Sequence, residues 1–295
     1  MEKRKKLKDL TIKDNFMFGA VMADEGLCKE FLELVLGFPI EKVTVNKEKS
    51  IVYHPEYKGV RLDVTAADED HTHYNVEMQA QRKKKLGKRS RYYHSQIDME
   101  LLLAGMDYPE LSDSYVIFIC DFDPFGKKKY QYTFDAACRE DKDVLLDDGS
   151  HTIFLSTRGK NEEEVPSGLV KLLRYVRAGL KESTADFEDA FVRRLQSAVG
   201  EIKKSREMEA RYMVFEELLK EEREDGKAEG RAEGRAEGRA IGKAESVLEF
   251  LDDLGEIPEQ LREKILAEKN LEVLTNYLKM AARAKNLEEF ENLIK

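Results

Sequence analysis

The first third of the chain alternates between helical and strand-like patterns of apolar residues. Apolar residues recur at helical spacing over residues 11–36 and Gly37 interrupts the pattern, so we expect one or two helices there. The spacing of Thr11 and Asp14 fits a capping box at the start of this helical region. Short runs rich in β-branched and aromatic residues then predict strands at 43–45, 51–53, 60–66 and 74–80.

A second helix and a buried strand follow. Helical spacing returns over residues 89–105, and the continuous apolar run at 114–122 is typical of a strand that is buried on both faces. Shorter runs at 130–134 and 152–155 complete the expected sheet. The order of helix, strands, helix and strand predicts an α/β sandwich.

Beyond residue 160 the strand patterns stop and helical spacing takes over. A four-residue repeat of Gly, Lys or Arg, Ala and Glu runs through residues 226–242. Each interior glycine costs a helix about 1 kcal/mol relative to alanine, so we expect a solvated linker that is helical only in part, rather than a partner-binding helix. The predicted organisation is a core at 1–160, a helical extension at 161–225, a repeat linker at 226–245 and a helical module at 246–295.

Composition limits the class of protein. Hydrophobic residues make up 41% and charged residues 37% of the 295 positions, so the chain can bury a core while much of it stays solvated. The basic N-terminus lacks a following apolar run and no membrane-spanning stretch is present, so we expect a cytoplasmic protein without a membrane partner. The widely spaced Cys28, Cys120 and Cys138 predict buried thiols rather than a zinc site or disulfides.

Two neighbouring predicted strands carry polar and apolar residues in alternation. A turn centred on Asp70 would pair residues whose numbers sum to 140, which places Asp63 opposite Glu77. Two carboxylates at this separation, with Cβ atoms about 5 Å apart, repel each other unless a cation or a proton lies between them. The apolar residues of both strands would point into the core, and the polar ones would share the other side: Arg61, Asp63, Thr65, Asn75, Glu77 and Gln79.

This pairing of carboxylates indicates a metal site. Mg²⁺ takes one or two protein carboxylates and commonly completes its coordination with water and substrate phosphates, as metal-assisted phosphodiester cleavage requires. The alternative is that Asp63 and Glu77 form ordinary surface ion pairs with Arg61 and nearby lysines.

The spacing of these residues matches a known family. The arrangement resembles the motif of the PD-(D/E)XK nuclease superfamily: Asp63 is followed by thirteen residues and then by Glu77-Met78-Gln79. Further segments resemble its Rpn-type branch of recombination-promoting nucleases or transposases, and the likeness is strong over about residues 8–160. These segments are Lys13 to Phe18, Gly59 to Val64, Tyr74 to Gln79, Arg89 to Tyr93 and Val116 to Phe125.

The resemblance implies a fold and an activity. It implies a restriction-endonuclease-like core, with a mixed sheet flanked by helices, and an all-α C-terminal extension. It further implies a Mg²⁺- or Mn²⁺-dependent DNA endonuclease linked to DNA recombination or mobile elements. Asp63 and Glu77 would hold the ion, with Asp14 a weaker candidate ligand. Gln79 occupies the position where the superfamily usually has lysine, and its neutral amide can only orient groups by hydrogen bonding.

A basic run follows the proposed metal strand. Residues 82–91 hold seven Lys and Arg residues and no acid, although the formal net charge of the chain is -9 and most of the excess acid lies after residue 160. A solvated loop and first helical turn would explain the run, but its position favours contact with DNA phosphates. Tyr92 and Tyr93 could stack on bases or pack inward. The predicted DNA-binding residues are Arg82, Lys83, Lys84, Lys85, Lys88, Arg89 and Arg91.

Two other classes of function fit the same sequence. One is a catalytically weak nuclease fold that serves as a DNA-binding or protein-interaction module. The other is a self-associating protein whose C-terminal helices form a homo-oligomer. The acidic tail could also occupy the basic face and occlude the site, an interpretation that rests on charge asymmetry alone.

Overall fold

The computed structural model describes residues 5–46, 50–51, 60–61, 63–82 and 85–294. The chain divides into two compact units, Met1–Met213 and Val214–Lys295, which are described separately. The finer division of the chain at residues 160, 225 and 245 remains a prediction.

The first unit contains a mixed sheet of six strands in the order β1-β4-β5-β6-β8-β7. Strands β5, β6 and β8 are parallel, whereas β1, β4 and β7 join the sheet antiparallel to their neighbours. The strands are β1 (Val43–Asn46), β4 (Val64–Asp68), β5 (His73–Gln79), β6 (Ser114–Cys120), β7 (Gln131–Phe134) and β8 (Ser150–Ser156). A separate two-stranded ribbon pairs β2 (Ser50–Ile51) with β3 (Val60–Arg61), so the predicted strand at 60–66 divides in two.

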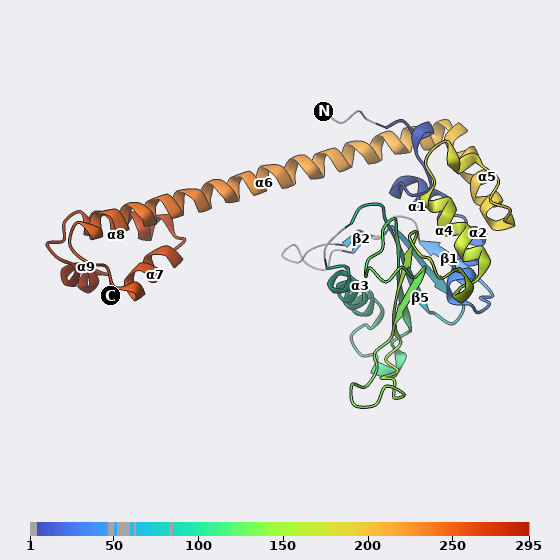
Figure 1. Cartoon of the computed structure of the whole chain (residues 1–295), viewed down its shortest axis with the longest axis horizontal. Helices are drawn as coiled ribbons and strands as arrows, with labels where there is room; N and C mark the ends of the chain where they lie inside the picture. The colour runs from blue at the N-terminus through green and yellow to red at the C-terminus, as the bar shows by residue number, and fades with distance from the viewer. Residues whose placement is uncertain (1–4, 47–49, 52–59, 62, 83–84, 295) are drawn as a thin grey trace. The chain divides into compact units, whose positions relative to one another are not determined.

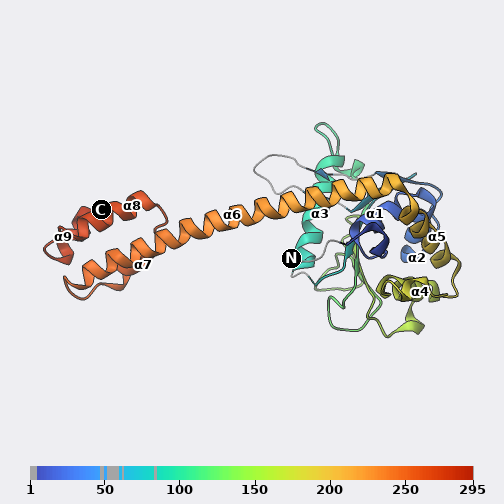
Figure 2. The same ribbon diagram turned by 90° about the horizontal axis from the view of Figure 1, so that it is seen from above.

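Helices cover both faces of the sheet, as predicted for a sandwich. Figures 1 and 2 show α3 on one side of the sheet and α1, α2, α4 and α5 on the other. The helices are α1 (Asn15–Met22), α2 (Glu25–Leu36), α3 (Leu86–Leu101), α4 (Ser167–Arg177) and α5 (Ala190–Lys204). Short 3₁₀ helices lie at Leu7–Asp9, Tyr108–Glu110, Glu162–Glu164 and Glu182–Thr184.

Local capping explains where the first two helices begin and end. Asp24 accepts the N–H of Leu27 at 2.9 Å at the start of α2, and Gly37 ends this helix in the left-handed conformation with φ of 80°. The predicted capping box at Thr11 is only half formed. The Asp14 carboxylate accepts the N–H of Thr11 at 2.7 Å, but the Thr11 hydroxyl also donates to Asp14, and Asp14 itself is the N-cap of α1.

The central strands are buried on both faces. Asn75 and Glu77 have no exposed surface, and Gln79 is 4% exposed. This corrects the expectation that the polar side chains of the hairpin face away from the core. Parallel pairing sets these three residues beside Val116, Phe118 and Cys120 of β6, which pack against α3. Helix α3 therefore seals the face that carries the polar side chains.

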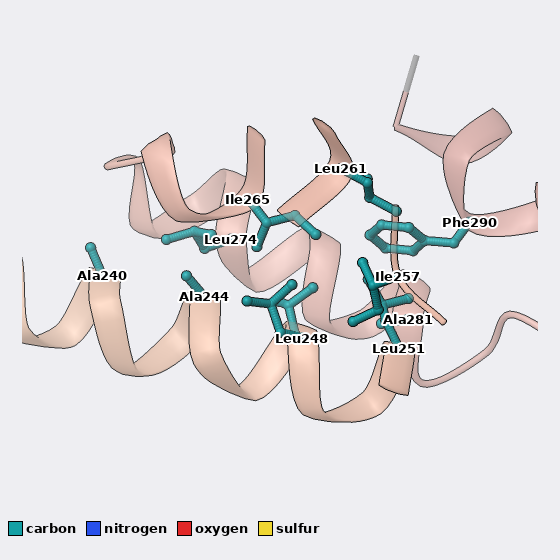
Figure 3. Close-up of a cluster of buried hydrophobic side chains, with 11 residues drawn as sticks. Ala240, Ala244, Leu248, Leu251, Ile257, Leu261, Ile265, Leu274, Ala281 and Phe290 are labelled. Atoms are coloured by element: carbon teal, nitrogen blue, oxygen red, sulfur yellow. The ribbon is translucent and has the colours of Figure 1, made fainter. Parts of the chain in front are cut away.

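The second unit is built from four helices around its own core. The end of α6 (Arg206–Asp252) packs with α7 (Glu259–Ala267), α8 (Leu271–Ala281) and α9 (Leu287–Leu293). Figure 3 shows the small side chains of Ala240 and Ala244 on α6, where they let the other helices approach closely. Gly255, with φ of 140°, and the N-cap Pro258 separate α6 from α7.

The four-residue repeat lies entirely within α6, so the segment expected to be a linker is helical throughout. Its described side chains before Ala240 are exposed. None of the described helices is both long enough and apolar enough to span a membrane. Cys28 and Cys120 are buried as expected, whereas Cys138 is only half-buried because it lies in a surface loop.

Candidate active site

The hairpin of β4 and β5 has the predicted register. Val64 pairs with Val76 and Thr65 pairs with Asn75, so paired residue numbers sum to 140. Two hydrogen bonds extend this pairing to Asp63, the residue before β4. The Asp63 N–H donates to Oε1 of Glu77 at 3.2 Å, and the Met78 N–H donates to Oδ2 of Asp63 at 3.0 Å. The backbone of each strand thus holds the carboxylate of the other.

Asp63 is also held by the first residue of α1. Nδ2 of Asn15 donates to both carboxylate oxygens of Asp63, at 3.1 and 3.2 Å. Asn15 is exposed and Asp63 is half-buried, so solvent reaches the site from this side. Sequence reasoning missed Asn15, although it lies inside the segment from Lys13 to Phe18 that supported the family resemblance.

Glu77 contacts a cation deep in the fold. Its Oε2 accepts Nη2 of Arg89 at 2.9 Å and the Tyr93 hydroxyl at 3.4 Å, while the Arg89 Nε donates to the same hydroxyl. Burial raises the pKa of Glu77, the negative charge of Asp63 raises it further, and the Arg89 guanidinium opposes both effects. The Arg89 guanidinium therefore offsets part of the cost of burying Glu77 beside another carboxylate.

Gln79 completes the cluster. Its Nε2 donates to Oε2 of Glu77 at 3.5 Å, and its Oε1 accepts Nη1 of Arg89 at 3.4 Å. The structure thus brings Asp63, Glu77 and Gln79 together, as the spacing in the sequence predicts.

The predicted DNA-binding run separates into two groups. Arg89 turns inward to Glu77 and Gln79, whereas the exposed members are Arg82, Lys85, Lys88 and Arg91. Lys83 and Lys84 lie outside the described residues. Tyr93 is 4% exposed and stacks on Phe118 with ring centroids 6.2 Å apart, so it packs inward and is not a platform for bases.

Asp14 lies apart from the pair of carboxylates. It bonds to Thr11 and to Nζ of Lys5, at 2.9 Å for the lysine. No cluster of three or more His, Cys, Asp or Glu side chains occurs among the described residues, so Asp14 does not join Asp63 and Glu77.

The chemistry of the Asp63–Glu77 pair fits a hard divalent cation. Two carboxylates are within the number that Mg²⁺ takes from a protein, and a bound cation would favour the charged form of Glu77, whose pKa is raised by burial and by the charge of Asp63. A cation bound to both carboxylates would compete with Arg89 for Glu77. Such a cation would reach the pair from the half-buried side, at Asp63.

Comparison with known proteins agrees with this geometry. The family model described as PD-(D/E)XK nuclease family transposase matches residues 8–228. No curated protein and no solved structure matches the chain. The family match includes the sheet, its flanking helices and every residue of the carboxylate cluster. Since it spans well over half of the chain, this protein belongs to the PD-(D/E)XK nuclease family transposases and has a nuclease or transposase-related function.

Proposed function

We propose that this protein is a Mg²⁺- or Mn²⁺-dependent DNA endonuclease in which Asp63 and Glu77 hold the ion. The observation that carries this proposal is the geometry of the two carboxylates, each of which accepts a backbone N–H from the segment that carries the other. When bound, a divalent ion supplies Lewis-acid stabilisation of the phosphate and lowers the pKa of water.

The side chains around the pair have separable roles in this proposal. Asn15 orients the Asp63 carboxylate, and Arg89 neutralises Glu77 in the absence of the ion. Gln79 cannot accept a proton as a base, so its amide orients water or a phosphate oxygen by hydrogen bonding. The exposed Arg82, Lys85, Lys88 and Arg91 would contact the DNA backbone.

One observation favours the alternative of a catalytically weak DNA-binding module. The Arg89 guanidinium already occupies one side of Glu77, and Glu77 has no exposed surface. If Arg89 stays in place when DNA binds, the pair cannot bind a metal through both carboxylates. The fold would then retain salt-sensitive DNA binding without hydrolysis.

Cleavage of supercoiled plasmid tests the proposal. The wild-type protein is incubated with plasmid in Mg²⁺, Mn²⁺, Ca²⁺ or EDTA, beside Asp63→Asn and Glu77→Gln. Glu201→Gln is the matched control, because Glu201 lies on the exposed surface of α5 and its one ion pair among the described residues is with Lys204. Cleavage in Mg²⁺ or Mn²⁺ by the wild type and the control alone supports the proposal. Cleavage that persists in both site variants contradicts it, and DNA binding without cleavage favours the alternative.

A further inference from the structure

A second polar cluster lies beside Gln79 at the carboxyl edge of the parallel strands. Strands β5, β6 and β8 end at Gln79, Cys120 and Ser156. The N–H of Asp121 donates to the carbonyl of Gln79 at 3.0 Å, and the N–H of Thr157 donates to the carbonyl of Cys120 at 3.0 Å. The residues that follow β6 and β8 therefore continue in a row from the candidate active site.

Asp121 binds two cations at once. Nζ of Lys13 lies 3.2 Å from its Oδ2, and Nη2 of Arg158 lies 3.2 Å from its Oδ1. The Thr157 hydroxyl also donates to Oδ1 at 2.9 Å. Because one carboxylate faces two cations, this cluster keeps an excess positive charge.

Donor groups in this cluster remain available to a ligand. Nζ of Lys13 donates to Asp121 and to the carbonyl of Arg177, and its third hydrogen has no acceptor among the described residues. Nε and Nη1 of Arg158 form no hydrogen bond within the described part of the chain. The side chain of Lys13 is 28% exposed and that of Arg158 is 41% exposed, whereas Asp121 is only 11% exposed. Asp121 thus acts as a half-buried tether that holds two cations at the surface.

The position of the cluster suits the backbone of a DNA strand. Neighbouring strands of a sheet are about 4.8 Å apart, so the ends of β6 and β8 lie about 5 and 10 Å from the end of β5. Successive nucleotides of one DNA strand rise by about 3.4 Å. A phosphate one to three nucleotides from the reacting bond would therefore reach Lys13 and Arg158, whose charged N–H groups can each donate to a phosphate oxygen.

We propose that Lys13 and Arg158, tethered by Asp121, form a subsite for a DNA backbone phosphate beside the Asp63–Glu77 pair. This inference rests on the proposed function, since it takes DNA as the substrate. It adds two residues outside the basic run at 82–91 and assigns them to a phosphate next to the one that reacts.

The subsite is tested by measuring how tightly the protein binds a fluorescent DNA duplex. Binding is followed by anisotropy over a series of KCl concentrations, and EDTA is present so that the DNA is not cleaved. The variants are Lys13→Gln, Arg158→Gln and the double variant. The controls are Lys29→Gln and Arg193→Gln, which remove cations that pair with Glu33 and Asp186 instead. Each lost phosphate contact is expected to reduce the slope of log K against log salt by about 0.9, so the double variant should lose about 1.8.

Asp121→Asn distinguishes two roles for the ion pairs of Lys13 and Arg158. In one role the two cations bind phosphate, and in the other the ion pairs only stabilise the fold. This variant keeps both cations and removes their tether, so its salt slope should not fall and its affinity should equal or exceed that of the wild type. If the ion pairs only stabilise the fold, Asp121→Asn should weaken DNA binding as much as Lys13→Gln and Arg158→Gln do. That result would overturn the subsite.

The remaining outcomes distinguish the subsite from the function. If the wild type binds DNA and the Lys13 and Arg158 variants have the same salt slope as the controls, the proposed subsite is wrong. The proposed function is not affected by that result. A wild-type protein that fails to bind DNA both in EDTA and in Ca²⁺ overturns both. Calorimetric binding of inorganic phosphate that is lost in the double variant, with an unchanged DNA slope, would identify a site for free phosphate and contradict the proposal.

Discussion

Nη2 of Arg89 lies 2.9 Å from Oε2 of Glu77, a carboxylate that has no exposed surface. This contact places a permanent cation where a divalent ion would also bind. In the metal-free protein the guanidinium offsets part of the cost of burying Glu77 beside Asp63. Metal binding and stability should therefore be coupled through Arg89.

Replacement of Arg89 should destabilise the metal-free protein. Arg89→Gln leaves the buried carboxylate without its cation, which we expect to lower the free energy of unfolding by about 2 kcal/mol in EDTA, allowing for partial exposure of the arginine. Urea unfolding followed by circular dichroism measures the change. Arg91→Gln, on the exposed side of α3, should change this free energy by less than about 0.5 kcal/mol. Equal effects of the two substitutions would contradict this role of the Arg89–Glu77 pair.

His94 should make stability depend on pH. Its ring lies between Ser114 and Thr152, 2.8 and 3.1 Å from their hydroxyls, and burial lowers its pKa from 6.5 to about 4. Between these values the unfolded chain binds a proton that the folded protein does not, so the free energy of unfolding falls as the pH falls from about 6.5 to about 4. The full effect is on the order of 3 kcal/mol.

A matched variant isolates this contribution from other groups that titrate in the same range. Unfolding of His94→Gln is measured at pH 7 and pH 4.5 beside the wild type. The wild type should lose about 2 kcal/mol more than the variant over this interval. A variant with the same pH dependence as the wild type would show that His94 is not the neutral buried group.

Asn75 should be replaceable with a gain in stability. Both polar atoms of its side chain are buried and lack a hydrogen-bond partner within the described part of the chain. Asn75→Val removes these polar atoms, and we expect the free energy of unfolding to rise by about 1 kcal/mol. The reason is that a buried polar group without a hydrogen-bond partner keeps the full cost of its desolvation. Ser114→Ala is the contrast, since Ser114 bonds to His94 and its loss should destabilise. A destabilised Asn75→Val would contradict this prediction.

The repeat segment should become more stable when its glycines are replaced. Gly230 and Gly234 lie within α6, and an added Cβ would meet nothing within 4 Å at either position. Each change to alanine should stabilise the helix by about 0.5–1 kcal/mol and increase the helical circular dichroism signal on heating. Gly37→Ala is the opposite control, because the φ of 80° at Gly37 disfavours a side chain. Unchanged melting of the Gly230 and Gly234 variants would indicate that the repeat is not helical in solution.

The sequence predicts much of the sheet because alternation and strand length are local properties. The hairpin register follows from the polar turn around Asp70, and this register alone places Asp63 opposite Glu77. Alternation does not reveal what covers each face, however. The same polar pattern fits a face exposed to solvent and a face covered by a helix. The complete burial of Glu77 therefore could not be predicted without knowing where α3 packs.

The long-range contacts of the site could not be read from the sequence. Arg89 lies in a run of basic residues, and only the packing of α3 on β6 separates its inward position from its exposed neighbours. Asn15 reaches Asp63 across 48 positions of the chain, and Lys13 reaches Asp121 across 108. The repeat was expected to form a linker because glycine disfavours helices, but its alanine, arginine and glutamate residues favour them, and the packed end of α6 extends the helix further.

Binding of Mn²⁺ tests the central claim most directly. Mn²⁺ is titrated into the protein and the free ion is followed by electron paramagnetic resonance, which measures whether the two carboxylates hold it. The proteins compared are the wild type, Asp63→Asn, Glu77→Gln and Asp14→Asn. The wild type and Asp14→Asn should bind Mn²⁺ alike, whereas Asp63→Asn and Glu77→Gln should each bind it at least about tenfold more weakly, a loss of about 1.4 kcal/mol or more. Equal binding by all four proteins would contradict the assignment of Asp63 and Glu77 as the metal ligands.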